Sequence, residues 1–431
     1  MRMILDRKQG PEYKKIENIH LQKAEEKKLK NNIPLYVVNA GDQDLIRIEF
    51  IFSAGAWNQH FPLVAFAANE MLEEGTKKHT ASEIAEIIDF YGAFFETEAS
   101  QDYAYVRLYT LNKHLKATLP IVEDIIKNAV FPENEFITFI QNRKQNLLVN
   151  EQKVDHVARK KFMELLFGEK YPYGHYVTAA DYDHLKRDYL IAFHKQFYTS
   201  DNCKIIVAGK VNQQSLDAID NYFGGTDWKS DNKIANQNYS VKSNNNDNKH
   251  LVIKKDAVQS AIRVGKILFN KTHPDYLPML VLNTILGGYF GSRLMANIRE
   301  DKGYTYGINS SIVSLKNAGY FVIGSEVGVD VCSKAIDEIF LEIKRLREGI
   351  IPDSELQLVK NYMLGTFLRG IDGPFALADK FRSIMEYGLS YDYYNNFINT
   401  VKNISSNELR ELANKYFQQD SMIELVVGNK K

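Results

Sequence analysis

The spacing of apolar residues along the chain follows two different periods. Residues 44–52 and 103–110 alternate between apolar and polar over most of their length, which predicts β-strands. Thr80 followed by Glu83 is a capping-box signature, and the apolar residues after it recur at helical spacing. Residues 331–348 carry one apolar stripe at the same helical spacing. Long helices combined with alternating strands predict an α+β protein whose core these stripes form.

The same order of segments occurs twice. Residues 192–210 and the end of the chain both carry aromatic residues into a loop with Asp, followed by a short apolar strand that ends at Gly. Phe197 corresponds to Phe417 at an offset of 220, and Gly209 to Gly428 at an offset of 219. Further blocks at nearly the same offset pair Pro132 with Pro352 and Phe162 with Phe381. Several blocks in one order at nearly one offset indicate a duplicated fold and not a solenoid of short repeats.

The duplication predicts the domain organisation. An N-terminal half spans residues 1–223, and a C-terminal half spans residues 251–431. Residues 224–250 contain seven Asn from Asn232 to Asn248, and so polar a stretch is typical of a linker. Each half is expected to hold a mainly antiparallel sheet covered by helices on one face.

Composition narrows the class of protein. The 431 residues include 54 Lys plus Arg and 54 Asp plus Glu, so the formal net charge is 54 − 54 = 0. Because nucleic-acid binding and polybasic membrane binding need excess positive charge, neither partner is expected. Cys203 and Cys332 are too few for a disulfide framework and are expected to be buried. No apolar run reaches the length of a spanning helix, and the first residues lack a signal-peptide core, which favours a cytoplasmic protein.

A search for catalytic motifs finds little. No two of the ten His residues lie four positions apart, as a zinc-binding pair on a helix does. The chain also lacks a phosphate-binding loop, a dinucleotide-binding fingerprint and the nucleophile elbow of hydrolases. The segment from Leu286 to Gly291 is rich in glycine but has no Lys-Ser or Lys-Thr after it, so we interpret it as a helix end. These patterns alone support only a two-lobed α+β protein.

One corner of the C-terminal half carries a cation and a phenol. Residues 292–307 begin as a helix, and Gly303 is placed to end it in a left-handed cap. A strand is expected to start at Tyr304. Arg299 and Tyr306 therefore lie on either side of a helix-to-strand corner. Taken alone, such an Arg is typical of a helix end and such a Tyr of a core strand.

The sequence of this corner resembles a known family. Residues 286–308 read LGGYFGSRLMANIREDKGYTYGI, a helix that ends in an Arg and is followed by a Gly and a Tyr. This stretch resembles the C-terminal half of the pitrilysin/insulinase-type metallopeptidases, the inverzincins. Residues 171–174 (YPYG) and 92–102 (GAFFETEASQD) also look like blocks of that family, and the resemblance covers essentially the whole chain. It implies two similar α+β halves, as in mitochondrial processing peptidase.

The resemblance locates a zinc motif that this chain has lost. The family carries H-x-x-E-H on the helix before a Gly-Thr pair, and Gly75–Thr76 fixes the register here. Phe66 and Glu70 then stand at the two His positions, Asn69 stands at the general-base Glu, and Glu151 matches a further family Glu. Because a catalytic zinc needs about three protein ligands, no metal is expected in this chain, and zinc is expected in a partner subunit.

The resemblance also implies a role for the corner that remains. In the family, the Arg and the Tyr reach across lobes or subunits to the scissile carbonyl above a zinc held by the other half; here they are Arg299 and Tyr306. Such donors stabilise developing oxyanion charge, while zinc activates water. Some bacterial members divide these parts between two chains, and this sequence matches the chain without the zinc motif. The implied function is that of a zinc-endopeptidase subunit that is inactive alone.

A peptide-binding strand is implied as well. The strand that matches the substrate strand of active relatives supplies Phe95, Glu96, Thr97, Glu98 and Ala99, and it can accept a peptide by edge pairing. The expected partners are a homologous zinc-bearing subunit and an unfolded peptide, and a homodimer is also open. One alternative is a non-catalytic peptide-binding, chaperone-like or assembly protein of the same fold. Another is a self-sufficient metalloenzyme with an unfamiliar site.

Overall fold

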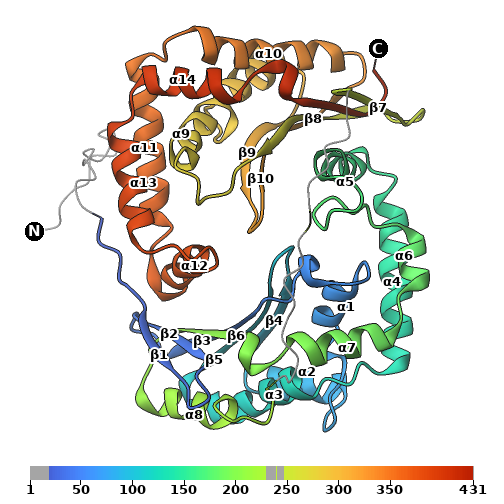
Figure 1. The fold of residues 1–431 in the computed structure, drawn as a ribbon, viewed down its shortest axis with the longest axis vertical. Coiled ribbons are helices and arrows are strands. Elements are labelled where there is room, and N and C mark those ends of the chain that lie inside the picture. The colour runs from blue at the N-terminus through green and yellow to red at the C-terminus, as the bar shows by residue number, and fades with distance from the viewer. Residues whose placement is uncertain (1–18, 230–238, 240–246, 431) are drawn as a thin grey trace, which may run out of the picture.

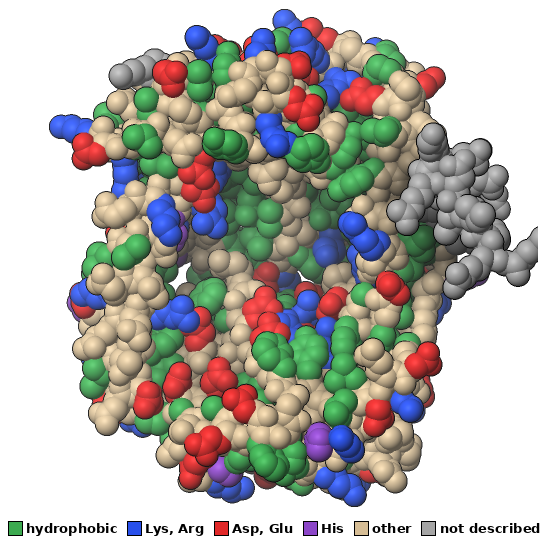
Figure 2. Space-filling view, turned by 180° about the vertical axis from the view of Figure 1, so that it is seen from behind, with side chains coloured by type: hydrophobic (Ala, Val, Ile, Leu, Met, Phe, Trp, Pro, Cys, Tyr) green, Lys and Arg blue, Asp and Glu red, His purple; other side chains and the backbone are tan. Residues whose placement is uncertain are grey.

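The computed structural model describes residues 19–229, 239 and 247–430. Within these ranges the chain forms two halves of similar design that face each other across a central hollow (Figure 1, Figure 2). Most of the predicted linker 224–250 and the first 18 residues of the predicted N-terminal half lie outside the described residues. None of the helices in these ranges is both long enough and apolar enough to cross a membrane.

The N-terminal half is built on a six-stranded sheet with the order β1-β2-β6-β3-β5-β4. β2 and β6 run parallel, and every other neighbouring pair runs antiparallel. The strands are β1 (Glu25–Lys28), β2 (Pro34–Asn39), β3 (Leu45–Phe52), β4 (Phe94–Ala99), β5 (Ala104–Leu111) and β6 (Cys203–Gly209). The α-helices are α1 (Val64–Glu70), α2 (Ala81–Phe90), α3 (Leu115–Asn128), α4 (Glu133–Asn150), α5 (Val154–Phe167), α6 (Ala179–His184), α7 (Arg187–Phe197) and α8 (Gln213–Phe223).

The C-terminal half repeats this design on a five-stranded sheet with the order β7-β11-β8-β10-β9. Here β7 and β11 form the parallel pair. The strands are β7 (Lys249–Ile253), β8 (Gln259–Leu268), β9 (Ile308–Ser314), β10 (Gly319–Gly328) and β11 (Ile423–Gly428). The α-helices are α9 (Tyr276–Gly287), α10 (Cys332–Glu348), α11 (Asp353–Arg369), α12 (Gly373–Met385), α13 (Asp392–Asn403) and α14 (Ser406–Tyr416). The predicted α+β class with two similar halves is confirmed, and each sheet is mixed because it holds one parallel pair.

Each sheet also receives a helix from the opposite half (Figure 1). The helices of each half cover the outer face of their own sheet and enclose its largest core cluster. α5 packs instead on β8 and β11 of the C-terminal sheet, where Phe162 shares a buried cluster with Leu425. α12 packs on β2 and β6 of the N-terminal sheet, where Leu377 shares a buried cluster with Val38. The expectation of helices on one face is therefore incomplete, because a repeat shows which elements recur and not which copy they pack against.

Local signals explain where several elements end. Thr80 caps α2 with a complete capping box, as predicted. Gly209 and Gly428, which the repeat pairs, both have positive φ, 119° and 136°. A Cβ at Gly209 would lie 2.2 Å from the carbonyl oxygen of Leu45 on the neighbouring strand. The paired glycines therefore mark one tight strand end that both halves share.

The strand at the helix-to-strand corner begins later than expected. β9 starts at Ile308 and not at Tyr304. The Thr305 hydroxyl lies 2.7 Å from the carbonyl oxygen of Glu326 in β10, so the residues before β9 form a turn tied to that strand. Tyr306 stands on this turn, outside the core of the sheet, and is 95% exposed.

The β4–β5 and β9–β10 hairpins, which correspond in the two halves, meet at their turns. Asp102 in the first turn accepts a hydrogen bond from the backbone N–H of Lys316 in the second, at 2.9 Å. The hydroxyl of Tyr173 donates to the same carboxylate and lies 3.4 Å from the backbone nitrogen of Asn317. The ammonium group of Lys316 lies 5.1 Å from the centre of the Tyr103 ring. Burial raises the pKa of Asp102, which these donors partly oppose.

Candidate functional site

The helix that matches the zinc-motif helix is α1, and it has become part of the core. Asn69, at the general-base position, is fully buried. Its amide nitrogen donates to the Tyr198 hydroxyl at 3.0 Å and to the Tyr105 carbonyl oxygen at 3.4 Å. Burial raises the pKa of Tyr198 far above its ordinary value, so this partner remains a neutral phenol. Asn69 is therefore a hydrogen-bonded core amide, and an amide cannot accept a proton from water at neutral pH.

Glu70, at the second His position, has a counter-charge from within the protein. Its carboxylate accepts a hydrogen bond from the Arg143 guanidinium of α4 at 2.8 Å. Burial raises the pKa of Glu70, and Arg143 opposes that shift. Arg143 thus supplies the positive charge that a metal ion would otherwise bring to this carboxylate. Phe66, at the first His position, is half-buried and offers no ligand atom.

Glu151 lies at the end of α4, and its recorded partners differ from those of Glu70. Its backbone carbonyl accepts a hydrogen bond from the Lys254 ammonium group. Burial lowers the pKa of both His156 and Lys160, and the Glu151 carboxylate opposes the shift in both. The structure records no contact between Glu151 and Glu70. Across residues 19–229 and 247–430, no group of three or more His, Cys, Asp or Glu side chains is placed to hold a metal ion, so the degenerate positions do not fit zinc.

Arg299 lies on the π-helix Met295–Asp301 and is partly buried. Its guanidinium carbon lies 4.5 Å from the centre of the Phe290 ring, which is itself 64% exposed. In the part of the chain that the structure describes, no ion pair or hydrogen bond is recorded for the Arg299 side chain. A cation held against an aromatic face keeps its N–H groups available for another acceptor.

Tyr306 stands beside a cavity of about 540 Å³ between the two halves. Arg159 and Phe162 of α5 form one wall, and residues of β8, β9 and β10 form the others. Arg299 does not line this cavity, and within the described ranges it makes no recorded contact with Tyr306. The structure thus places the two side chains on one corner of the fold, close to solvent, without joining them.

The predicted substrate strand is β4, which forms one edge of the N-terminal sheet. Only β5 pairs with it among the described strands, so its outer backbone groups face no strand. Glu96 and Glu98 pair with Arg107 of β5 at 3.3 Å and 2.7 Å. Phe95 packs against the core instead. The edge is therefore open to an extended peptide, while its acidic side chains already have a cationic partner.

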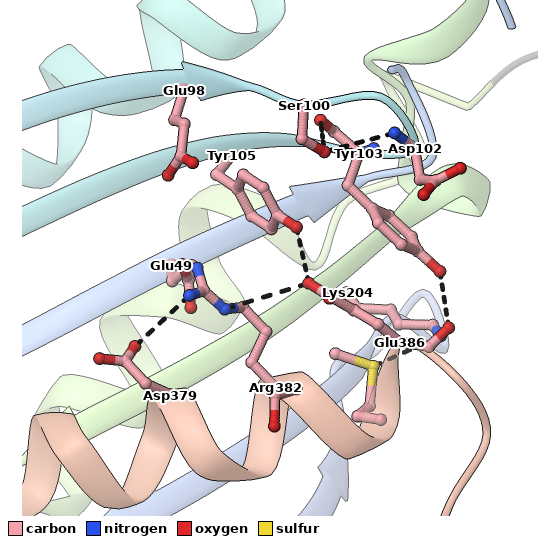
Figure 3. A network of polar contacts seen from close by, with 12 residues as sticks. Glu49, Glu98, Ser100, Asp102, Tyr103, Tyr105, Lys204, Asp379, Arg382 and Glu386 are labelled. Carbon is pink, nitrogen blue, oxygen red and sulfur yellow. Dashed lines mark hydrogen bonds and ion pairs between the residues drawn. The ribbon is translucent and has the colours of Figure 1, made fainter. Parts of the chain in front are cut away.

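A buried polar network at the junction of the halves was not expected from the sequence (Figure 3). Glu49 of β3 is fully buried and accepts hydrogen bonds from Arg107 and from Arg382 of α12, the latter at 2.7 Å. Tyr105 donates to Glu386, the residue that follows α12, at 2.7 Å. Burial raises the pKa of Glu386, which this hydrogen bond opposes. The available signal was two charged residues, Arg47 and Glu49, inside a strand that is otherwise apolar, because buried charge needs a partner.

Comparisons with known proteins agree with this geometry. The family model described as Peptidase M16 inactive domain matches residues 184–363. A Bacillus subtilis protein named uncharacterized zinc protease YmxG is 23% identical over 366 residues, which are 83% of this chain and 86% of that protein. A solved Pseudomonas fluorescens peptidase M16 inactive domain has a TM-score of 0.84 at 20% identity, over 95% of this chain and 99% of that one. A solved Helicobacter pylori protease has a TM-score of 0.86 at 17% identity, over 95% of this chain and all (100%) of that one.

A duplicated α+β fold whose zinc helix carries no ligand set defines a metallopeptidase-like protein. These matches confirm that the chain resembles the M16 peptidases, the pitrilysin/insulinase-type group, and the match of residues 184–363 to an inactive domain agrees with its degenerate zinc motif.

Proposed function

We propose that this chain is the zinc-less subunit of a two-chain M16 peptidase, and that it supplies Arg299 and Tyr306 to a peptide cleaved at a zinc site in a partner chain. A contrast between two sites supports the proposal. On α1, Asn69 is locked into the core and Glu70 is paired with Arg143. At the helix-to-strand corner, Arg299 and Tyr306 keep their polar groups available near solvent.

The proposed roles follow from the chemistry of the two groups. When water attacks a peptide carbonyl, the oxygen of that carbonyl becomes negative. Arg299 donates charge-assisted N–H bonds to this oxygen, and Tyr306 donates its O–H. Phe290 holds the guanidinium without neutralising it, so the charge stays available. Activation of the attacking water belongs to zinc in the partner chain.

The test starts from a tagged chain purified from its natural source, followed by identification of any partner with an intact H-x-x-E-H motif. The complex is expected to cleave an unfolded peptide, and a zinc chelator is expected to abolish cleavage. Arg299→Ala is expected to lower kcat/KM roughly 100-fold, because one oxyanion donor is lost, and Tyr306→Phe to lower it less. Arg369→Ala, at the exposed end of α11, is the control and should leave activity unchanged.

Unchanged kcat/KM in Arg299→Ala, with the complex intact, would refute the catalytic role. Cleavage by the isolated chain with stoichiometric zinc would instead favour a self-sufficient metalloenzyme. Peptide binding that is insensitive to both chelation and Tyr306→Phe, without cleavage by any complex, would favour the chaperone-like alternative.

A further inference from the structure

The cavity beside Tyr306 corresponds to a place that is filled in the N-terminal half. There, the inner face of the sheet beside α12 carries large charged side chains (Figure 3). Glu49 is held between Arg107 of the neighbouring strand and Arg382 of α12. Arg107 also reaches Glu98 of β4 at 2.7 Å. These side chains occupy the space between the helix and the strands.

The C-terminal half has different residues at the three matching positions, and two of them, Gly324 and Met163, are smaller and uncharged. The strand register places Arg263 opposite Gly324, at the place of the Glu49–Arg107 pair. On α5, Met163 stands where α12 carries the half-buried Arg382. A Cβ at Gly324 would lie only 3.2 Å from a guanidinium nitrogen of Arg263, so this glycine leaves room for the Arg263 side chain. The cavity of about 540 Å³ lies on this face of the C-terminal sheet.

Three charged groups lie together in the wall of this cavity. Asp155 of α5 contacts Arg263 through one carboxylate oxygen and Arg159 through the other, the latter at 3.0 Å. The Arg263 side chain is 8% exposed and that of Arg159 is 67% exposed. One carboxylate between two guanidinium groups leaves a net charge of 2 − 1 = +1. Arg159 contacts Asp155 through its Nε, so its two terminal NH₂ groups remain available to a second carboxylate.

The rest of the cavity combines an apolar surface with a free strand edge. Met163 and Val322, both half-buried, supply apolar surface close to the charged groups, and the buried Phe162 lies beneath them in the wall. Asn309 and Ser311 line the cavity from β9, the edge strand of the C-terminal sheet. An extended peptide that pairs with this edge can place an end side chain on the apolar surface.

We propose that this cavity binds the C-terminal residue of a peptide. The terminal carboxylate lies on Arg159, an apolar side chain lies on Met163 and Val322, and the main chain follows the edge of β9. The group of Asp155, Arg159 and Arg263 carries one net positive charge, and Glu326, exposed at the same cavity, brings the charged residues of the lining to 2 − 2 = 0. This balance opposes a dianion such as phosphate more than the single charge of a peptide carboxylate. The peptide as ligand rests on the proposed function, but binding here requires neither Arg299 nor a partner chain.

The test is a direct binding measurement on the isolated chain by fluorescence anisotropy. The probe is an N-terminally fluorescein-labelled, extended peptide ending in leucine, made as the free acid and as the C-terminal amide. The amide is expected to bind about tenfold more weakly, because it loses a charge-assisted contact. Arg159→Gln should weaken binding of the free-acid peptide until its affinity equals that of the amide peptide. Lys161→Gln makes the same charge change on the same helix, away from the cavity, and should keep the preference for the free acid.

Three results would overturn the proposal: equal affinities for acid and amide, an unaltered preference in Arg159→Gln, or displacement of the peptide by millimolar inorganic phosphate. The last result would indicate a general anion site. Because this measurement uses no partner and no cleavage, its failure leaves the Arg299 experiment unaffected. Conversely, a normal preference for the free acid together with unchanged cleavage by Arg299→Ala would refute only the catalytic role.

Discussion

Asn69 shows how one residue moves a catalytic position into the core. Its amide nitrogen is bonded to Tyr198, while its amide oxygen is buried without a hydrogen-bond partner among the described residues. Asn69→Asp would place an ionised carboxylate there, with one oxygen facing the Tyr105 carbonyl oxygen in place of the donor. We expect the free energy of unfolding at pH 7 to fall by about 2–4 kcal/mol, measured by urea denaturation.

The pH dependence of this variant separates charge from packing. Burial would raise the folded-state pKa of the new carboxyl above its unfolded value, so the protonated form is favoured in the folded protein. The loss of stability should therefore grow as pH rises through the folded pKa and shrink at acidic pH. Asn69→Leu, of similar size but uncharged, is the control. Its loss of unfolding free energy should be the same at pH 7 and at acidic pH. An equal, pH-independent loss in both variants would show that Asn69 is not in a charge-excluding site.

At the residue scale, the sequence predicted what is missing better than what replaces it. The register at Gly75–Thr76 predicts Phe66, Asn69 and Glu70 as the degenerate positions, and the structure shows that Asn69 is buried and that Glu70 is paired with a cation. That Glu70 pairs with Arg143 could not be foreseen, because the two residues lie 73 positions apart on different helices. A pattern of spacing reports local periodicity, whereas an ion pair between helices depends on how those helices pack.

At the scale of elements, α5 belongs to the N-terminal half by sequence and to the C-terminal sheet by packing. Phe162 is 2% exposed and lies in the cluster that joins this helix to β8 and β11. We expect Phe162→Ala to destabilise the protein by about 3–5 kcal/mol through the cavity it leaves. Hydrogen exchange should rise most in β8 and β11, although the substituted residue lies in the other half.

The matched variant is Phe381→Ala, at the corresponding position of α12, where the ring packs on Tyr36 at 4.7 Å. It should loosen β2 and β6 in the N-terminal sheet instead. If each substitution loosened only the sheet of its own half, the exchanged packing would contribute little to stability.

Elements with strong local signals were predictable. The alternation of β3 and β5, the capping box of α2 and the apolar stripe of α10 each correspond to an element of the structure. The start of β9 was not predictable from local signals, because the contact of the Thr305 hydroxyl with Glu326 of β10 holds the residues before β9 in a turn. The exchange of α5 and α12 was also hidden, since two copies of one pattern pack equally well in either pairing when only the sequence is considered.

At the scale of the whole molecule, duplication provides both the joint between the halves and the difference between their inner faces. The joint consists of the two exchanged helices and the contact between the two hairpin turns at Asp102 and Lys316. The difference lies in Gly324, which stands opposite Arg263 where the other copy has Arg107 opposite Glu49. The formal net charge of 0 conceals this local arrangement, with a buried charge network in one half and an open, partly cationic cavity in the other.

If the exchanged helices are the main joint, neither half should be stable alone. When the halves are expressed separately, residues 1–229 lack α12, which covers the N-terminal sheet, and residues 247–431 lack α5, which covers the C-terminal sheet. Each fragment therefore exposes part of an apolar sheet face. Each fragment is expected to aggregate or to melt without cooperativity, whereas the two co-expressed fragments should elute together and show the circular dichroism of the intact chain. Phe162→Ala in the first fragment should weaken this association, because it removes a buried aromatic contact of α5 with the other sheet. Cooperative unfolding of either isolated half, with the stability it has in the intact chain, would show that the halves are independent domains and that the exchange merely brings them into contact.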